Sequence, residues 1–505
     1  MAVKRNLIAN YVGQGWTALM GLVFIPLYIK YIGIEAYGLI GLFAVLQSSL
    51  TVLDMGMRPT LNREMARFTG GRRTADSILD LLRSIEFLAM CVVILIGVGV
   101  AHASVWVATS WLKTGCLPIS VVAQAITIMG VVSALRFAEG IYSSSLIGLQ
   151  RQVLLNVINS SMATLRGLGA VGIVIWVSPT IQAFFLWQGL ISLISLVILS
   201  VMTYSSLPSG TRGGRFSLSE LRGVSRFASG MVGITLLALM LTQVDKVLLS
   251  RLLPLSDYGR YTLAVVVAGA LYILVYPVSQ AFYPRFTQLH AASKNLGLIQ
   301  IYHQGSQLVS VLLGSAAIVL MVFSEIFLRL WTHDAELAHR VAPLLTLLAL
   351  GNLLNGLMSI PYQMQLAHGW AGLGVRINAI AVLVIVPAIL WVTPRYGAEG
   401  AAWVWVGLNA GYLLIGAHFM YRRILTSEKW RWYVRTTLPP LFAATITATT
   451  LRWMLPISES GFANAVALAA AAVITLIASV AAAPLLHPPL RSIAARILAI
   501  NSIRI

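Results

Sequence analysis

Ionisable residues stand inside long apolar stretches of this chain, and their types and spacing could do chemistry. An ionised side chain at the centre of a bilayer costs about 2.5–3.5 kcal/mol on insertion scales, so such residues mark ion pairs, wet pathways or ligand sites. Arg136 and Glu139 share a helical face and can pair, and Arg83 and Glu86 repeat their spacing. The full set is Asp54, Arg83, Glu86, Arg136, Glu139, Arg166, Asp245, Lys246 and Glu325.

Arg166 has no acidic residue within one helical turn along the sequence. It therefore needs a partner from another helix or a water-filled cavity. A guanidinium suits bidentate contact with phosphate or carboxylate oxygens. We predict that Arg136, Arg166 and Lys246 line one cavity that receives an anionic ligand. The alternative is that these charges form internal ion pairs that only hold helices together.

Carboxylates in the same stretches could carry a coupling ion. Asp245 and Lys246 are adjacent, so on a helix they point about 100° apart and cannot both face lipid. Asp245 is the better candidate for binding a proton or cation, and Glu139 and Asp54 are further candidates. The alternative role of Asp245 is to anchor Lys246 or a neighbouring helix.

Three arginines stand at the inner ends of apolar stretches: Arg58, Arg63 and Arg285. They could gather where an anionic substrate enters, or they could be ordinary positively charged anchors. The eight histidines show no metal-ligand spacing, and no glycine-rich phosphate loop is present. The sequence therefore predicts no metal, no cofactor and no ATP hydrolysis.

Composition defines the class of protein. The chain has 505 residues, of which 58% are hydrophobic and 10% charged. Soluble domains carry about 25% charged residues, so we expect a polytopic membrane protein. The net charge of +19 fits basic inner loops better than nucleic-acid binding, because no basic soluble domain is present. We also expect no cleavable signal peptide, and we interpret Cys91 and Cys116 as packing residues.

A helix needs about 20 mainly apolar residues to cross a bilayer. By this criterion about fourteen apolar stretches could position these residues. We therefore predict an all-α protein with about 14 transmembrane helices. The predicted spans are residues 6–30, 36–57, 77–103, 118–146, 154–177, 180–203, 226–250, 258–282, 302–329, 342–367, 374–393, 398–420, 436–455 and 462–486.

The distribution of basic residues predicts the orientation. With the N-terminus in the cytoplasm, 23 of the 35 Lys and Arg residues fall in cytoplasmic connections or the C-terminal tail. Basic residues are enriched in cytoplasmic loops, so both termini are predicted to lie inside. The connections on the other face are short, and none could hold a catalytic domain. We therefore do not expect an enzyme.

A repeated phrase indicates two halves. Tyr37-Gly38 returns as Tyr258-Gly259, and Trp176-Val-Ser-Pro179 returns as Trp391-Val-Thr-Pro394. Repeats of this kind are typical of transporters whose substrate site lies between the halves. We predict two six-helix lobes related by a pseudo-two-fold axis along the membrane normal. The predicted boundaries are 1–222 for the N-lobe with its linker, 223–425 for the C-lobe, and 426–505 for two further helices and a basic tail.

Several motifs follow one another along the chain: the run from Asn6 through Pro26 to Gly38, Asp54-Met-Gly56 with Arg63-Glu64, Asp245-Lys246 with Tyr258-Gly259, Tyr283-Pro284-Arg285, and Tyr396-Gly397 with Glu399-Gly400. They resemble the motifs of Wzx-type flippases, which handle O-antigen and exopolysaccharide repeats. That family lies in the superfamily that also contains the multidrug antiporters (MATE) and the lipid II flippase. The resemblance spans most of residues 1–425 and rests on the order of individually weak motifs.

The resemblance implies a MATE-like fold and the transfer of an undecaprenyl-pyrophosphate-linked oligosaccharide across the bacterial cytoplasmic membrane. A hydrophilic cavity would hydrate the head group while alternating access completes the move. Membrane lipids, a polysaccharide polymerase, chain-length machinery and a coupling ion (H⁺ or Na⁺) are the implied partners, with no nucleic acid. The alternatives are a multidrug or lipid II transporter of the same superfamily and, from another class, a membrane polysaccharide polymerase or ligase.

Overall fold

The computed structural model describes residues 2–71, 73–207, 214–454 and 460–487. In these ranges the chain is built of helices and contains no β-strand beyond one isolated bridge. Ten described stretches are long and apolar enough to cross a membrane. The prediction of an all-α, multi-pass membrane protein is therefore confirmed, whereas the count of fourteen spans stays a prediction.

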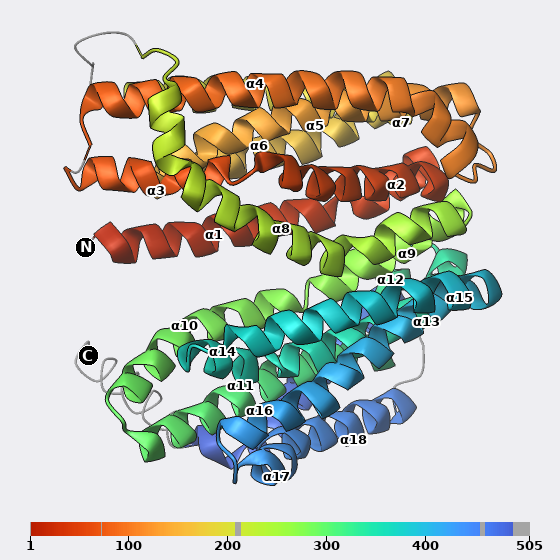
Figure 1. Ribbon diagram of the computed structural model, residues 1–505. Coiled ribbons are helices and arrows are strands. Elements are labelled where there is room, and N and C mark those ends of the chain that lie inside the picture. The colour runs from red at the N-terminus through yellow and green to blue at the C-terminus, as the bar shows by residue number, and fades with distance from the viewer. Residues whose placement is uncertain (1, 72, 208–213, 455–459, 488–505) are drawn as a thin grey trace, which may run out of the picture. The chain divides into compact units, whose positions relative to one another are not determined.

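The chain forms two compact units, Met1–Gly259 and Arg260–Ile505 (Figure 1). Unit 1 contains α1 (Ala2–Val23), α2 (Ile25–Leu50), a 3₁₀ turn (Thr51–Asp54), α3 (Met57–Thr69), α4 (Ala75–Trp106), α5 (Ile119–Gly148), α6 (Gln152–Gly172), α7 (Ile181–Ser205), α8 (Leu218–Leu252) and the start of α9 (Leu255–Gly269). Unit 2 contains the rest of α9, α10 (Tyr272–Ala291), α11 (Asn295–Val322), α12 (Ser324–Thr332), α13 (Ala335–Leu357), α14 (Ser359–Ala367), α15 (Ala371–Gly411), α16 (Ala417–Arg423), α17 (Lys429–Arg431), α18 (Leu438–Met454) and α19 (Gly461–Ala481).

The compact units do not end where the sequence placed its lobe boundaries. Unit 1 extends past residue 222 because α8 packs against α2, α3 and α4. Unit 2 runs from Arg260 to Ile505 without a division near residue 425. The boundaries 1–222, 223–425 and 426–505 describe the lobes of the expected family fold, and they stay predictions.

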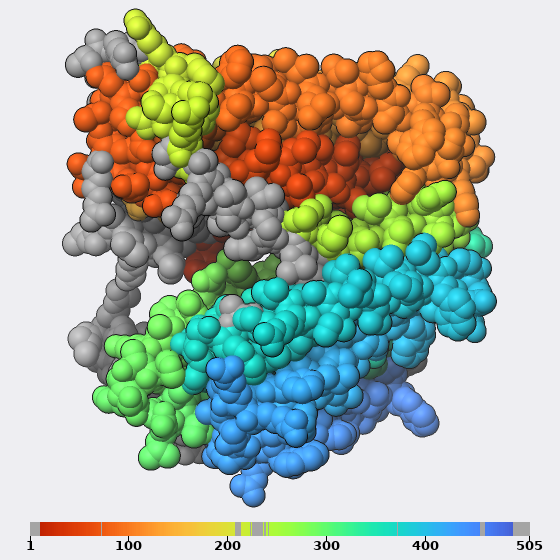
Figure 2. All heavy atoms as spheres, in the orientation of Figure 1, coloured from red at the N-terminus to blue at the C-terminus, as the bar shows by residue number. Residues whose placement is uncertain are grey.

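Within unit 1, α5 packs against α3, α4 and α7, while α6 packs against α1 and α7. The N-terminal half of α4 contributes Leu81 and Ile85 to an apolar core that also holds Leu61 and Phe137. Its other face lies along one surface of the unit (Figure 2) and exposes Phe87, along with further apolar side chains. An exposed apolar helix face of this length is typical of contact with lipid.

Two glycines turn the chain within segments that look like single helices. Gly33 has φ 84° and ψ 162° inside α2, and Gly397 has φ 61° and ψ −147° inside α15. These angles are accessible to glycine but strained for residues with a Cβ. The predicted spans 6–30 and 36–57, and 374–393 and 398–420, therefore meet at glycine turns.

The repeated Tyr-Gly pairs are packing motifs within unit 1. A Cβ on Gly38 would lie 2.6 Å from the carbonyl oxygen of Leu255, and one on Gly259 would lie 2.3 Å from that of Ile34. The backbones of α2 and α9 therefore touch where both pairs occur. The adjacent Tyr37 and Tyr258 are buried. Small residues allow such close helix approach in membranes.

In unit 2, α11 is the central helix and packs against α10, α13, α18 and α19. Its core includes Tyr302, Phe286 and Trp432, all fully buried. His303 lies in the same region, with Nε2 2.8 Å from a carboxylate oxygen of Glu428. This polar contact ties α11 to the segment that precedes α18.

Candidate functional site in unit 1

Three of the charged residues predicted inside the early spans lie on α5 and α6, where they meet α7. Arg136 and Glu139 lie on α5, and Arg166 lies on α6. All three belong to helices that are long and apolar enough to span a membrane. Charge at this depth needs partners from the neighbouring helices, and the structure supplies them.

Arg166 forms an ion pair with Glu139, with its Nη2 3.0 Å and 3.1 Å from the two carboxylate oxygens. Ser195 on α7 donates to the same carboxylate at 3.0 Å. The spacing of Arg136 and Glu139 allows them to pair, but no hydrogen bond or ion pair joins them among the described residues. The carboxylate is instead bonded by side chains of α6 and α7, which sequence spacing along α5 could not reveal. Arg166 has no acidic residue within one turn of its own helix, and its partner is Glu139 of the neighbouring helix α5.

Arg136 is held by neutral groups. Its Nη1 donates to Gln47 Oε1 at 3.1 Å, and its Nη2 donates to Gln188 Oε1 at 2.9 Å. Its Nε donates to Ser192 Oγ at 3.4 Å, and its Cζ lies 5.1 Å from the centre of the Phe43 ring. Amide and hydroxyl oxygens orient a guanidinium without neutralising it. Arg136 therefore keeps its positive charge available, in contrast to Arg166.

Arg58 approaches the same region from α3. Its Nε lies 3.6 Å from Asp54, its Nη2 donates to the carbonyl oxygen of Phe137 at 3.1 Å, and its guanidinium occupies space beside Gly140. A Cβ on Gly140 would lie 2.2 Å from Arg58 Cζ, so the guanidinium would have to move if residue 140 carried a side chain. Burial lowers the pKa of Arg58 below its ordinary value, against the attraction of Asp54 and Glu139, which raises it.

A cavity of about 270 Å³ lies beside Arg58 and Arg136. No carboxylate is among the described residues that line it, so its wall is positively charged. The buried Nε2 of Gln47, Nε of Arg58 and Oγ of Ser133 have no hydrogen-bond partner among the described residues. Buried polar atoms without partners are costly, and a bound anion or water would satisfy them. The lining residues are Gln47, Ser48, Leu50, Thr51, Arg58, Ser133, Arg136 and Phe137.

Lys246 and Asp245 contact each other on α8, with Nζ 3.4 Å from the carboxylate oxygen. Lys246 also donates to the carbonyl oxygen of Thr242, within the same helix. Neither of these contacts involves Arg136 or Arg166. The three residues were predicted to line one cavity, and of these the observed cavity is lined by Arg136 alone.

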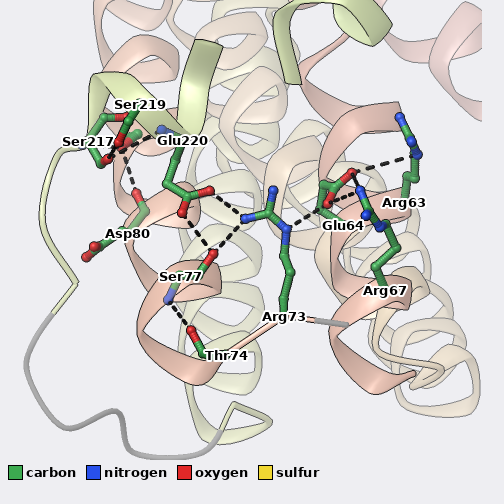
Figure 3. Close-up of polar contacts among 11 residues, drawn as sticks. Arg63, Glu64, Arg67, Arg73, Thr74, Ser77, Asp80, Ser217, Ser219 and Glu220 are labelled. Atoms are coloured by element: carbon green, nitrogen blue, oxygen red, sulfur yellow. Dashed lines mark hydrogen bonds and ion pairs between the residues drawn. The ribbon is translucent and has the colours of Figure 1, made fainter. Parts of the chain in front are cut away.

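Arg63 belongs to a separate polar cluster at the end of α3 (Figure 3). The carboxylate of Glu64 is only 1% exposed and lies 3.7 Å from Arg63, 3.2 Å from Arg67 and 2.7 Å from Arg73. Arg73 also contacts Glu220, on the first turn of α8, at 2.6 Å. The cluster therefore fastens α8 to α3 and α4 within unit 1.

Electrostatics in this cluster favour the charged arginine. Burial alone would lower the pKa of Arg73, but its hydrogen bonds and attraction to Glu220 and Glu64 outweigh burial and raise it. Arg285, the third arginine predicted at the substrate entrance, lies in unit 2, where it is exposed and donates to Gln288 at 2.6 Å. The entrance role of Arg58, Arg63 and Arg285 stays a prediction.

The sequence analysis missed the neutral residues that orient Arg136. Gln47, Gln188 and Ser192 come from α2 and α7, and Gln188 is 6% exposed. A glutamine inside an apolar span costs free energy unless it is hydrogen-bonded, so it is a weak sequence signal for a polar site. Which residues it contacts depends on helix packing.

The sequence matches the family described as "Polysaccharide biosynthesis protein" over residues 3–290. No curated protein sequence matches the chain. The structure is similar to that of the lipid II flippase MurJ in an inward closed conformation, with a TM-score of 0.71 at 12% identity, covering 94% of this chain and 97% of that one.

The structure is also similar to that of an inward-facing multidrug resistance MATE transporter, with a TM-score of 0.63 at 12% identity, covering 81% and 96% of the two chains. A third similar structure is a transporter of the same superfamily from Pyrococcus furiosus, with a TM-score of 0.54 at 14% identity, covering 85% and 96%. At these identities the likeness concerns the fold alone.

The match covers more than half of the chain, and the chain therefore belongs to the polysaccharide biosynthesis protein family. Its fold is that of the MurJ and MATE transporters. The resemblance to Wzx-type flippases and the MATE-like fold predicted from the sequence are confirmed.

Proposed function

We propose that this protein is a flippase that moves an undecaprenyl-pyrophosphate-linked oligosaccharide from the inner to the outer leaflet of the bacterial cytoplasmic membrane. The product would serve O-antigen, exopolysaccharide or capsule synthesis. The family assignment supports a role in polysaccharide assembly, and the fold supports transport. Both termini are proposed to lie in the cytoplasm, in keeping with the distribution of basic residues.

The observation that carries this proposal is the cationic cavity between Arg58 and Arg136. A positively charged wall formed by Arg58 of α3 and Arg136 of the membrane-spanning helix α5 suits an anionic head group and disfavours a cationic drug. The volume of about 270 Å³ is below that of sites for drug-sized ligands, which begin at about 300 Å³, and suits a phosphate or one sugar residue.

The charge balance around the cavity supports the same conclusion. Arg58, Arg136 and Arg166 carry three positive charges, whereas Asp54 and Glu139 carry two negative charges when both are ionised. One positive charge is therefore left for the cargo or for a change in protonation. We propose Arg136 as the main cargo residue, with Arg166 in support, and Glu139, Asp54 and Asp245 as candidates for the coupling ion.

The alternatives predict other losses. If the protein were a multidrug transporter, cells without it would lose drug efflux. If it were a lipid II transporter, they would lose export of the peptidoglycan precursor. Neither case predicts a specific effect on surface polysaccharide. A polymerase or ligase would leave lipid-linked repeats in the outer leaflet. The flippase proposal predicts that they accumulate in the inner leaflet.

The test compares Arg136→Gln with Arg136→Lys in cells that lack the native protein. Arg136→Gln should lower polysaccharide export at least about tenfold, because hydrogen bonds to charged groups contribute about 1.5–3 kcal/mol. Arg136→Lys should keep part of the export, because the charge remains while the planar fork is lost. Both variants must reach the membrane in normal amounts.

The matched control is Arg83→Gln, which removes an arginine that is paired with Glu86 at 3.0 Å and does not line the cavity. It should export polysaccharide at nearly the wild-type rate. Wild-type export by Arg136→Gln would exclude Arg136 as a cargo residue. Normal outer-leaflet display of repeat units in cells without the protein would exclude the flippase function itself.

A further inference from the structure

A second polar cluster lies in unit 2, and it carries no charge. Tyr272 on α10, Asn352 and Asn355 on α13, and Trp405 and Asn409 on α15 form one hydrogen-bonded group. All five belong to stretches that are long and apolar enough to span a membrane. Polar residues at this depth either join helices or belong to a substrate pathway.

The donors and acceptors of this cluster can be assigned from groups that have only one role. The carbonyl oxygen of Trp405 only accepts, so the contact at 2.8 Å comes from Asn409 Nδ2. Asn409 Oδ1 then accepts from Asn355 Nδ2 at 2.8 Å. Asn355 Oδ1 is left to accept from the hydroxyl of Tyr272 at 3.0 Å.

The orientation of Asn352 follows independently. The indole Nε1–H of Trp405 only donates, so the atom 3.0 Å away is Asn352 Oδ1. The hydroxyl of Tyr272 lies 3.3 Å from the same oxygen. The Nδ2 of Asn352 has no hydrogen-bond partner among the residues that the structure describes, and it is not among the fully enclosed polar atoms.

Asn352 is therefore an unusual member of the cluster. The residue is 7% exposed, yet no described residue accepts from its amide nitrogen, and this nitrogen is not fully enclosed. The Tyr272 hydroxyl uses its hydrogen within the cluster, so its oxygen can still accept. A donor and an acceptor side by side match the two roles of a hydroxyl group.

We propose that the cluster around Asn352 and Tyr272 is a binding site for a neutral, hydroxylated sugar residue. A sugar hydroxyl would accept from Asn352 Nδ2 and donate to Tyr272 Oη. The inference rests on the proposed function, because it assigns this site to the glycan of the lipid-linked cargo. It differs from the cavity in unit 1 because its groups are uncharged.

The indole of Trp405 holds the site in place. A Cβ on Gly351 would lie 2.3 Å from Trp405 Cδ1, so the ring rests on the backbone of α13 where glycine leaves room. The Nε1–H bond then fixes the amide of Asn352 with its nitrogen directed away from the indole. Fixing a side chain before binding lowers the entropy cost of binding.

The test measures binding of two probes to purified protein in lipid nanodiscs at pH 8. One probe is the lipid-linked oligosaccharide extracted from the producing cells, and the other is undecaprenyl pyrophosphate without sugar. Asn352→Asp keeps an oxygen for Trp405 and Tyr272 but replaces the N–H donors. It should bind the glycosylated lipid about five- to tenfold more weakly and the sugar-free lipid like wild type.

A second variant and a control keep the test independent of folding. Tyr272→Phe removes the acceptor without touching the Asn352–Trp405 bond and should show the same selective loss. Asn378→Asp is the matched control, because Asn378 is a partly buried asparagine that accepts from a tyrosine, Tyr412, at 3.0 Å outside the cluster. It should leave binding of both lipids unchanged.

The outcomes separate the two proposals. Equal weakening of both lipids by Asn352→Asp and Tyr272→Phe would show that the cluster only joins helices, and would overturn the inference. Wild-type binding of the glycosylated lipid by both variants would overturn it as well. A wild-type protein that binds neither lipid would overturn the proposed function and this inference with it.

Discussion

Replacement of Arg166 and Glu139, singly and together, tests whether this pair is structural. At 3.0 Å, and with an effective dielectric constant of about 20, their Coulomb attraction is about 5.5 kcal/mol, most of which offsets desolvation. Their side chains are only 23% and 12% exposed. Removal of one partner should therefore cost about 3–5 kcal/mol, because it leaves the other charge buried and unpaired.

Glu139→Leu should be the more damaging single change, because it leaves Arg58, Arg136 and Arg166 with one fewer carboxylate. The double variant Arg166→Met/Glu139→Leu should lie within about 1 kcal/mol of wild type, since buried pairs are often replaced by apolar residues at little cost. Thermal unfolding in detergent measures this. If unit 1 unfolds by itself, a loss of about 3 kcal/mol corresponds to a fall of about 6–12 °C.

The control is the exposed pair Arg340 and Glu336, at 2.6 Å, whose removal should change stability by no more than about 1 kcal/mol. If the double variant lost as much stability as the two single variants added together, the two residues would not be energetically coupled and the reasoning would be refuted. The same variant also tests the cargo role of Arg166. If it is stable but binds cargo as weakly as Arg136→Gln, Arg166 contacts the cargo. If it binds like wild type, Arg166 is structural.

Gly33→Ala should lower the unfolding temperature, because an alanine in this backbone conformation is strained by about 1–3 kcal/mol. The control Gly21→Ala, within α1, should not lower it. Equal effects of the two changes would contradict the need for glycine at the turn in α2. Arg73→Met should cost about 3 kcal/mol by the same thermal assay, because it leaves a buried carboxylate without its shortest ion pair; an unchanged midpoint would refute that role. In a variant with Cys91 replaced by serine, the exposed Cys116 should react with a membrane-impermeant maleimide added outside intact cells. Labelling only in inverted vesicles would show that the predicted orientation is the wrong way round.

Much of the fold was predictable because each span must be apolar over a known length. The ten apolar helices all overlap predicted spans. The spacing of Arg83 and Glu86 along one helix allows an ion pair, and the structure contains that pair at 3.0 Å. Helix geometry brings residues three apart within reach of each other, but it does not decide whether they pair, because Arg136 and Glu139 have the same spacing and Glu139 pairs with Arg166 instead.

The site was only partly predictable. The sequence singled out Arg136 as an ionisable residue inside an apolar span, but it could not reveal the partners of Arg136, because Gln47 and Gln188 come from other helices. The asparagine cluster of unit 2 was missed altogether, since neutral amides stand out less in an apolar span than charges do. What distinguishes Asn352 is visible only in the tertiary structure. Its side-chain oxygen accepts hydrogen bonds from Trp405 and Tyr272, whereas its amide nitrogen donates to no described residue.

The sequence by itself determined that this is a helical membrane protein, because hydrocarbon admits long apolar helices and little else. It also identified which ionisable residues stand inside those helices. The tertiary structure decided which charges neutralise one another. Helix packing placed Glu139 against Arg166 and left Arg136 among neutral oxygens, since contacts between helices depend on their rotation and depth, which no local sequence pattern encodes.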